Sequence, residues 1–409
     1  MQEKKLKTLH IFENYLPESQ NWTFRILNNF EDVDVYVCAL EYHNPQFVNP
    51  KINLIEIPGY VNCELMVEGG LHSESFYDKA INKLKRNTRF EKYLEYLAKK
   101  IKELGIDLLH CHFANVGWKF MKLRKLTGKP LIVSFYGFDY ESLPYTFKDW
   151  EKRYQELFNT ADLFICEGPF GAGILKSKGC TEKKIRVNRL GVDLKKFPFY
   201  EREKKENELS LVQISNFFQK KGHIYTLQAF MQALKTCPNL SLTFVGSDFD
   251  NNKEKLRKIV HEHHLEDKVV FLDFLDFSQL YEFLKSFHVF IQPSCYADNR
   301  DCEGGAPVAI LDAEASGMPV IATTHCDIPQ EVIHKRTGYL SPEKNAIALT
   351  ESIVRFYRMP NDTYQGFAKE AREHIEQNFD TVKNSSMLKN IYLDYLHRFA
   401  MSIIALVSI

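Results

Sequence analysis

The stretch EGGAPVAILDAEASGMPVIAT, residues 303–323, decides the fold, because it reads in turn as a loop, a helix and a buried strand. Pro307 suits the first turn of a helix, where its missing N–H costs nothing. Gly317 suits the left-handed residue that ends a helix. The short apolar run MPVIAT then fits a parallel strand that is covered on both faces. This order of elements predicts an α/β domain.

The same alternation continues along the whole chain. Short runs rich in Val, Ile, Leu and Phe, which suit parallel strands, alternate with helical periods such as YTLQAFMQALKTC. One series of runs covers residues 7–12, 33–40, 52–57, 106–113, 129–137, 161–168 and 184–193. A second series covers residues 209–217, 240–247, 268–274, 288–294 and 318–323. We therefore predict two Rossmann-like, doubly wound α/β domains that face a cleft.

A charged segment without an apolar period, FPFYEREKKENELS, separates the two series near residues 197–209, as is typical of a linker. A chain of 409 residues is also too long for one ordinary core. We place the first domain at residues 1–200 and the second at residues 201–384.

The composition excludes several classes of protein. Its 53 basic and 53 acidic residues balance, so nothing draws the whole chain to nucleic acid. The nine cysteines include no C-x-x-C pair, which indicates reduced thiols rather than disulfides or a zinc site. No secretory signal is visible, and the apolar run AMSIIALVSI is too short to span a bilayer. We therefore expect a cytoplasmic protein.

The opening stretch also predicts chemistry. Gly304 and Gly305 let the backbone approach a ligand closely, and the helix behind them presents free N–H groups at the carboxyl edge of the sheet. Glu303 stands just before that helix end, which favours its ionised form as an acceptor for two hydroxyls. Backbone amides that bind phosphate, next to a carboxylate that accepts from hydroxyls, suit a phosphorylated sugar as the ligand. The alternative is that Glu303 complements the helix end and that the glycines form an ordinary turn.

This stretch resembles the signature of the family-4 retaining glycosyltransferases of GT-B fold, especially those of bacterial exopolysaccharide biosynthesis. The family pattern is a Glu, seven residues, a second Glu and then A-x-A-x-G-x-P-V-I-A-T, which this chain follows with one extra residue. Further segments resemble the family in its own order over most of the chain: NYLPESQNWTFRIL, IDLLHCHFA, SFYGFDY, NRLGVDLKKF, LVQISNFFQKKGHIYTLQAF and FIQPSCYADNRDCEGGAP.

On the donor side, the resemblance implies that Glu303 contacts hydroxyls of the donor sugar and that Lys221 holds its phosphate. Asn216 stands where the family has an arginine, so Lys220 or Arg300 is left to supply that charge. Asp312 falls at the second signature Glu, a ligand of the ribose hydroxyls. A surface-facing helical Asp312, or Glu314 on an exposed face, is the alternative. The other expected donor-side residues are Ser215, Gly304, Gly305 and Ala306.

On the acceptor side, His112 lies nearest the end of its predicted strand and can orient or deprotonate an acceptor hydroxyl. A buried, hydrogen-bonded histidine is the alternative. Tyr136 replaces the family histidine before Gly137 and would not titrate near neutral pH. Asp139 and Ser19 complete the acceptor-side candidates.

The resemblance implies retaining transfer of a hexose-type sugar from a UDP- or GDP-sugar to a hydroxyl of a glycan or lipid-linked glycan, without a metal or a cofactor. It also implies that residues 385–409 pack on the first domain. A nucleotide-sugar epimerase of the same fold, and a catalytically weak subunit that binds a nucleotide-sugar, stay open as alternatives. The basic region of residues 79–102 is either a solvated amphipathic helix or a contact with the inner face of the cell membrane.

Overall fold

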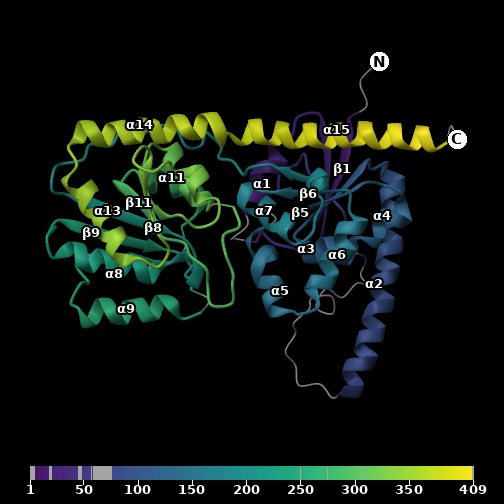
Figure 1. Cartoon of the computed structure of the whole chain (residues 1–409), viewed down its shortest axis with the longest axis horizontal. Helices are drawn as coiled ribbons and strands as arrows, with labels where there is room; N and C mark the ends of the chain where they lie inside the picture. Colours follow the sequence, from purple (N-terminus) through teal and green to yellow (C-terminus); the bar gives the residue numbers. More distant parts are fainter. Residues whose placement is uncertain are drawn as a thin grey trace.

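The chain forms two α/β domains that lie side by side, each built on an all-parallel sheet (Figure 1). The computed structural model describes residues 5–17, 21–44, 48–56, 58, 76–248, 250–273, 275–305 and 307–407. The prediction of two doubly wound domains is confirmed.

The first sheet has the strand order β3-β2-β1-β4-β5-β6-β7. Every residue of β4, β5 and β6 is buried, because helices cover both faces of the sheet. The order reverses between β1 and β4, and open sheets bind ligands at the carboxyl ends beside such a switch point. The strands are β1 (Leu6–Tyr15), β2 (Val33–Tyr42), β3 (Asn53–Leu54), β4 (Leu108–His112), β5 (Leu131–Ser134), β6 (Leu163–Cys166) and β7 (Ile185–Val187).

The helices of the first domain include one long element, α2, whose described half packs on the core through Tyr93, Leu94, Leu97 and Ile101. Its exposed basic side chains alternate with acidic ones, as in the 3.0 Å pair of Lys100 and Glu103. The helices are α1 (Asn21–Asn28), α2 (Phe76–Leu104), α3 (Ala114–Phe120), α4 (Lys122–Thr127), α5 (Leu143–Thr146), α6 (Trp150–Thr160) and α7 (Pro169–Ser177), with shorter turns η3 (Phe138–Ser142) and η4 (Glu182–Lys184).

The second sheet has the order β10-β9-β8-β11-β12-β13, with its switch point between β8 and β11. The run patterns predict all of these strands except β13, whose four residues, GYLS, contain too few apolar positions. The strands are β8 (Leu209–Ile214), β9 (Leu240–Val245), β10 (Val269–Leu272), β11 (Val289–Gln292), β12 (Val320–Thr323) and β13 (Gly338–Ser341).

Helices surround the second sheet in the same way. The helix predicted within the opening stretch is α11, and it ends at a left-handed Gly317 with φ of 75°. The elements are η5 (Gln219–Lys221), α8 (His223–Leu234), α9 (Asn252–Glu262), η6 (Phe277–Gln279), α10 (Leu280–Leu284), α11 (Val308–Ala315), α12 (Ile328–Glu331), α13 (Ala346–Arg358) and α14 (Asn361–Asn378).

The charged segment between the domains is packed rather than free. Arg202 is 2 % exposed and donates to the carbonyl oxygens of Phe287 (3.0 Å) and Ser316 (2.7 Å). Lys204 is 3 % exposed and donates to the carbonyl oxygen of Tyr357. This part of the chain is therefore fixed to the second domain.

The chain returns to the first domain at its end. In Figure 1, α14 lies along the second domain and α15 (Thr381–Val407) continues in line along the first. Leu388 and Tyr392 of α15 are buried in a cluster with residues of β1, β4, β5 and β6. The chain passes between the domains twice, near Val192 and near Thr381, and these two segments are hydrogen-bonded to each other. The Val192 N–H donates to the Phe379 carbonyl (2.8 Å), and the Thr381 N–H donates to the Val192 carbonyl (3.1 Å).

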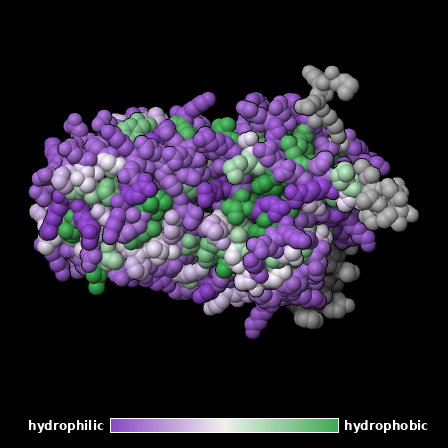
Figure 2. All heavy atoms as spheres, turned by 45° about the horizontal axis from the view of Figure 1, so that its top comes forward, coloured by the Kyte–Doolittle hydropathy of each residue, from purple (hydrophilic) through white to green (hydrophobic). Residues whose placement is uncertain are grey.

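The surface is mostly hydrophilic on the face that carries α14 and α15, with apolar side chains in several separate groups (Figure 2). The exposed apolar residues of α15 include Val382, Met387, Leu393 and Met401. Across the described residues, none of the helices combines the length and the apolar character needed to cross a membrane.

Candidate active site

The candidate site lies where loops from the carboxyl ends of the two sheets meet. Gly304, in the loop between β11 and α11, has a φ of 83°. A Cβ on Gly304 would lie 2.4 Å from the Gly137 nitrogen, and a Cβ on Gly137 would lie 2.1 Å from the Cys302 carbonyl oxygen. Gly304, which was expected to admit a ligand, and Gly137 therefore bring the two domains into backbone contact in this structure.

Glu303 is held as an ion by side chains of the second domain. Its carboxylate accepts hydrogen bonds from Lys221 Nζ (2.7 Å) and Ser294 Oγ (2.7 Å), and its side chain is 6 % exposed. Burial opposes ionisation, but Lys221 and Lys220 outweigh it and lower the pKa of Glu303 to about 2. Two lysines keep this carboxylate charged, whereas the sequence analysis attributed its charge to the positive end of the helix dipole.

Lys221 reaches Glu303 because the turn η5 holds it between β8 and α8. Gly222 ends that turn with φ of 70°, and a Cβ there would lie 2.0 Å from the Pro293 carbonyl oxygen. The phosphate loop of the sequence analysis thus sits directly against the end of β11. Lys220 Nζ lies 3.0 Å from the Cys302 carbonyl oxygen and 3.0 Å from Asp301 Oδ2.

The remaining predicted donor-side residues have partners within the protein. Asn216 Oδ1 accepts from the Ser247 N–H (3.2 Å), and Ser215 Oγ lies 3.1 Å from His223 Nε2. Arg300 pairs with Glu141 of the first domain at 2.8 Å. The second positive charge at Glu303 therefore comes from Lys220. Ala306 and Ser19 fall outside the described residues.

Asp312 forms an ion pair between the domains. Its oxygens accept from Arg25 Nη1 (2.6 Å) and Nη2 (2.8 Å), and both side chains are almost completely buried. The Arg25 guanidinium also lies over the Phe277 ring, 4.9 Å from its centroid. The surface-facing alternative for Asp312 is wrong, and a ribose hydroxyl could reach this carboxylate only after Arg25 had moved.

Glu314 is also not on an exposed face, contrary to the sequence interpretation. It is completely buried, because α11 packs against α14 and against the sheet at β11 and β12. Burial raises the pKa of Glu314 well above its usual value.

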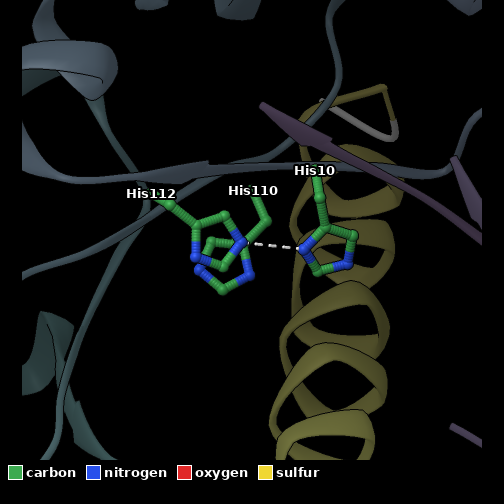
Figure 3. Close-up of side chains that lie close together, drawn as sticks. All are labelled: His10, His110 and His112. Atoms are coloured by element: carbon green, nitrogen blue, oxygen red, sulfur yellow. Dashed lines mark hydrogen bonds between the residues drawn. The ribbon is translucent and has the colours of Figure 1, made fainter. Parts of the chain in front are cut away.

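Three histidines of the first domain form a buried cluster (Figure 3). His10 comes from β1, and His110 and His112 come from one face of β4, with their two ring centroids 4.4 Å apart. His10 Nδ1 lies 3.0 Å from His112 Nε2. Burial lowers the pKa of all three rings, to about 3 for His10, so they are neutral.

The donor atoms of this cluster lie within 4.8 Å of one another, a spacing that could hold a metal ion. Each ring already has a hydrogen-bond partner, however. His110 lies 2.6 Å from the Tyr392 hydroxyl and 2.7 Å from Ser134 Oγ, and His112 Nδ1 lies 2.8 Å from the Tyr136 hydroxyl. We interpret the cluster as a hydrogen-bonded core network.

His112 therefore meets the domain boundary through Tyr136. His112 is 5 % exposed and stacks on Phe12 at 4.1 Å between centroids, in agreement with the buried alternative. Tyr136 directly precedes Gly137, which touches the loop of Glu303. The acceptor-side candidate nearest to the cleft is thus the tyrosine, with the histidine behind it.

Asp139 shapes the loop that carries Tyr136. It is completely buried, and its oxygens accept from the N–H groups of Tyr136 (2.9 Å) and Ala114 (3.0 Å). Burial raises the pKa of Asp139 to about 8 against these two hydrogen bonds. In this structure the carboxyl group joins the ends of β4 and β5 rather than facing an acceptor.

Sequence reasoning missed two carboxyl groups at the domain boundary. Glu167 follows β6 directly, and a Cβ on Gly305 would lie 2.7 Å from the Glu167 Cβ. Asp327 of the second domain accepts from the Phe170 N–H (2.9 Å) at the start of α7. A signal for Glu167 was present, since it is a charged residue placed directly after the apolar strand LFIC, at the carboxyl edge where such sheets bind ligands.

Known proteins share both halves of this architecture. Residues 31–196 match the model described as Glycosyltransferase Family 4, and residues 196–374 match that described as Glycosyl transferases group 1. The chain is 31% identical over 277 residues to the colanic acid biosynthesis glycosyltransferase WcaL of Salmonella typhimurium, covering 67% of each chain. It is 28% identical to the amylovoran biosynthesis glycosyltransferase AmsK of Erwinia amylovora, covering 68% of each.

Solved structures agree on the fold. The Anabaena HepE complex with UDP-glucose superimposes with a TM-score of 0.71 at 15% identity, over 95% of this chain and 100% of that one. A glycosyltransferase of Rickettsia africae gives 0.73 at 15% identity, over 96% and 99%.

Two Rossmann-like domains that meet at a lysine-paired glutamate and a glycine loop define a glycosyltransferase of GT-B fold. Within that class, the chain belongs to glycosyltransferase family 4 and is homologous to WcaL and AmsK.

Proposed function

We propose that this glycosyltransferase moves a hexose-type sugar, with retention of configuration, from a UDP- or GDP-sugar to a hydroxyl of a growing exopolysaccharide glycan or its lipid-linked precursor. The observation that carries the proposal is the pair of Lys221 and Glu303 beside the glycine loop. A cation for the diphosphate and a carboxylate for the sugar hydroxyls are already adjacent there. No observation favours the epimerase alternative.

Donor binding would exchange partners within this pair. The Lys221 ammonium would turn to the diphosphate, and Glu303 would accept hydrogen bonds from hydroxyls of the sugar. Lys220 and Ser294 also contribute to the low pKa of Glu303, so two of its stabilising partners remain when Lys221 turns away. The site thus carries charges of both signs at the places where the substrate needs them.

The transfer itself needs positioning more than a protein nucleophile. The bond between the anomeric carbon and the phosphate oxygen breaks, and the acceptor oxygen forms a new bond on the same face. The acceptor proton passes to the departing phosphate oxygen. We expect Lys221 to stabilise the leaving group without a metal or a cofactor. Lys221 stabilises the charge that grows on the phosphate, and we expect closure of the domains at the glycine contact to exclude water.

A lipid-linked acceptor would bring the enzyme to the inner face of the cell membrane. A relative from Xanthomonas campestris, 25% identical over 228 residues, is a mannosyltransferase that acts on cellobiosyl-diphosphopolyprenol. Residues 79–102 are the segment that we propose for contact with the membrane.

The test is a screen of UDP- and GDP-sugars by thermal shift, followed by assays of donor turnover with and without acceptors. Lys221→Ala and Glu303→Gln should each lower turnover by about 10²–10³-fold, as the loss of one charge-stabilising group does in other active sites. Lys235→Ala, an exposed lysine at the end of α8, is the control and should keep full activity.

Full activity in both site variants would contradict the site assignment. Binding of a nucleotide-sugar without any turnover by the wild type would favour the weak-subunit alternative. Turnover in excess EDTA is expected to be unchanged.

A further inference from the structure

We propose that Glu167, with Asn188 and Tyr136, forms the site that binds the acceptor hydroxyl. This inference rests on the proposed transferase function and names the acceptor side of its cleft. Glu167 follows β6 and lies against Gly305, in the loop that also carries Glu303. The residue from the first domain is therefore in contact with the donor-side loop of the second.

A small cavity, lined by apolar as well as polar side chains, adjoins Glu167. Its volume of about 20 Å³ suffices for about one water in this closed state. The polar residues of the lining come from the ends of four neighbouring strands, and they are His110, His112, Ser134, Tyr136, Glu167 and Asn188. The cavity thus opens at the carboxyl edge of the first sheet, beside its switch point.

The uncharged lining of this cavity fits a sugar hydroxyl and its adjoining ring carbons rather than a phosphate. Among the described residues that line it, none is a lysine or an arginine, and its two histidines are neutral because they are buried. All of the lining belongs to the first domain and to α15, whereas Lys221 and Glu303 belong to the second domain. A sugar hydroxyl would find acceptors and donors here, and a diphosphate would find no charge to bind it.

Asn188 provides an independent sign of a missing ligand. It is 4 % exposed, and its Oδ1 atom has no hydrogen-bond partner among the described residues. Buried acceptors of this kind are normally satisfied, because each unsatisfied one costs stability. A hydroxyl in the cavity would donate to Asn188 Oδ1 and accept from the Glu167 carboxyl group.

The surroundings of Glu167 keep that carboxyl group protonated at neutral pH. Burial and the negative charges of Asp327 and Glu303 raise its pKa to about 8, against the Gly305 N–H and Lys220. Tyr136 and Glu331 also face this group. A protonated carboxyl group both donates and accepts, as a hydroxyl ligand requires.

The test separates acceptor binding from donor turnover. The probes are the p-nitrophenyl glycosides of glucose, galactose, mannose and N-acetylglucosamine, of which one that the wild type glycosylates is chosen. Glu167→Ala should raise the acceptor KM about tenfold, equivalent to one lost hydrogen bond, and leave donor hydrolysis without acceptor within about twofold. Asn188→Ala should have the same effect. Glu182→Ala, whose side chain is 77 % exposed in the same domain, is the control.

Glu167→Gln keeps a donor and an acceptor, so it should keep the acceptor KM within about threefold at pH 7. The wild type should lose acceptor affinity above about pH 8, where Glu167 ionises, and the Gln variant should not. Unchanged acceptor KM in Glu167→Ala, or an equal loss of hydrolysis and transfer, would overturn the inference. Absence of any donor turnover by the wild type would instead contradict the proposed function itself.

Discussion

At the scale of single residues, the ion pair of Arg25 and Asp312 is the contact with the largest expected effect on stability. Both side chains are almost fully buried, so removing one partner leaves a charge without compensation in the interior. Arg25→Met should therefore lower the free energy of unfolding by about 3–5 kcal/mol, and the double variant Arg25→Met with Asp312→Leu should recover much of that loss.

Urea denaturation measures these effects. The control is Arg300→Met, because Arg300 also pairs across the domains, with Glu141, but is 49 % exposed. It should cost less than about 1 kcal/mol. If Arg25→Met and Arg300→Met lowered the free energy of unfolding equally, burial would not be what sets the strength of the Arg25 pair.

Only some of these single-residue contacts could be predicted from the sequence. Glu303 and Lys221 could be named because each lies in a motif of local spacing, and the structure joins them in one ion pair. The partner of Asp312 could not be named, since Arg25 lies 287 residues away and no periodicity links the two. Glu314 looked exposed because neighbouring helix positions do not reveal which strand covers them.

At the scale of elements, α15 should contribute strongly to the stability of the first domain. Tyr392 is completely buried and its hydroxyl lies 2.6 Å from His110 Nδ1. Tyr392→Ala should lower the free energy of unfolding of that domain by about 3–5 kcal/mol, as other large-to-small core substitutions do.

Leu393 is the matched control, since it is the next residue on the same helix but is 43 % exposed. Leu393→Ala should change stability by less than about 0.5 kcal/mol. The measurement is thermal or urea unfolding followed by tryptophan fluorescence, because Trp118 and Trp150 both lie in the first domain. A small effect of Tyr392→Ala would mean that α15 is only loosely attached.

The order of elements was the most predictable level of this protein. Buried parallel strands consist of short apolar runs, and these can be read directly from the chain. The return of α15 was expected from the family alone, because amphipathic periodicity indicates that a helix packs without indicating on what. The segment of residues 197–209 resembles a free linker in sequence because it is charged. Its packing could not be predicted, because Arg202 is buried by donating to carbonyl oxygens more than 80 residues further along the chain.

At the scale of the whole molecule, the glycine contact between the domains should control closure. Gly137 has helical dihedral angles, so alanine would be tolerated there without backbone strain. Its Cβ, however, would lie 2.1 Å from the Cys302 carbonyl oxygen. Gly137→Ala should hold the domains apart, and transfer should fall by about 10²-fold, because small displacements of reacting groups are costly.

Small-angle X-ray scattering gives the second readout, an increased radius of gyration. Gly173→Ala on α7 is the control, because a Cβ there would have no neighbour within 4 Å. An unchanged radius together with full activity in Gly137→Ala would show that the two domains need not touch at this point.

The return of α15 to the first domain also has a consequence for synthesis. On the ribosome the second domain, although encoded later, is complete before the first, because the 27 residues of α15 follow it in the chain. Until they emerge, Leu388 and Tyr392 are missing from the first domain, and His110 lacks one of its partners. The first domain therefore exposes an apolar face to aggregation until α15 packs onto it.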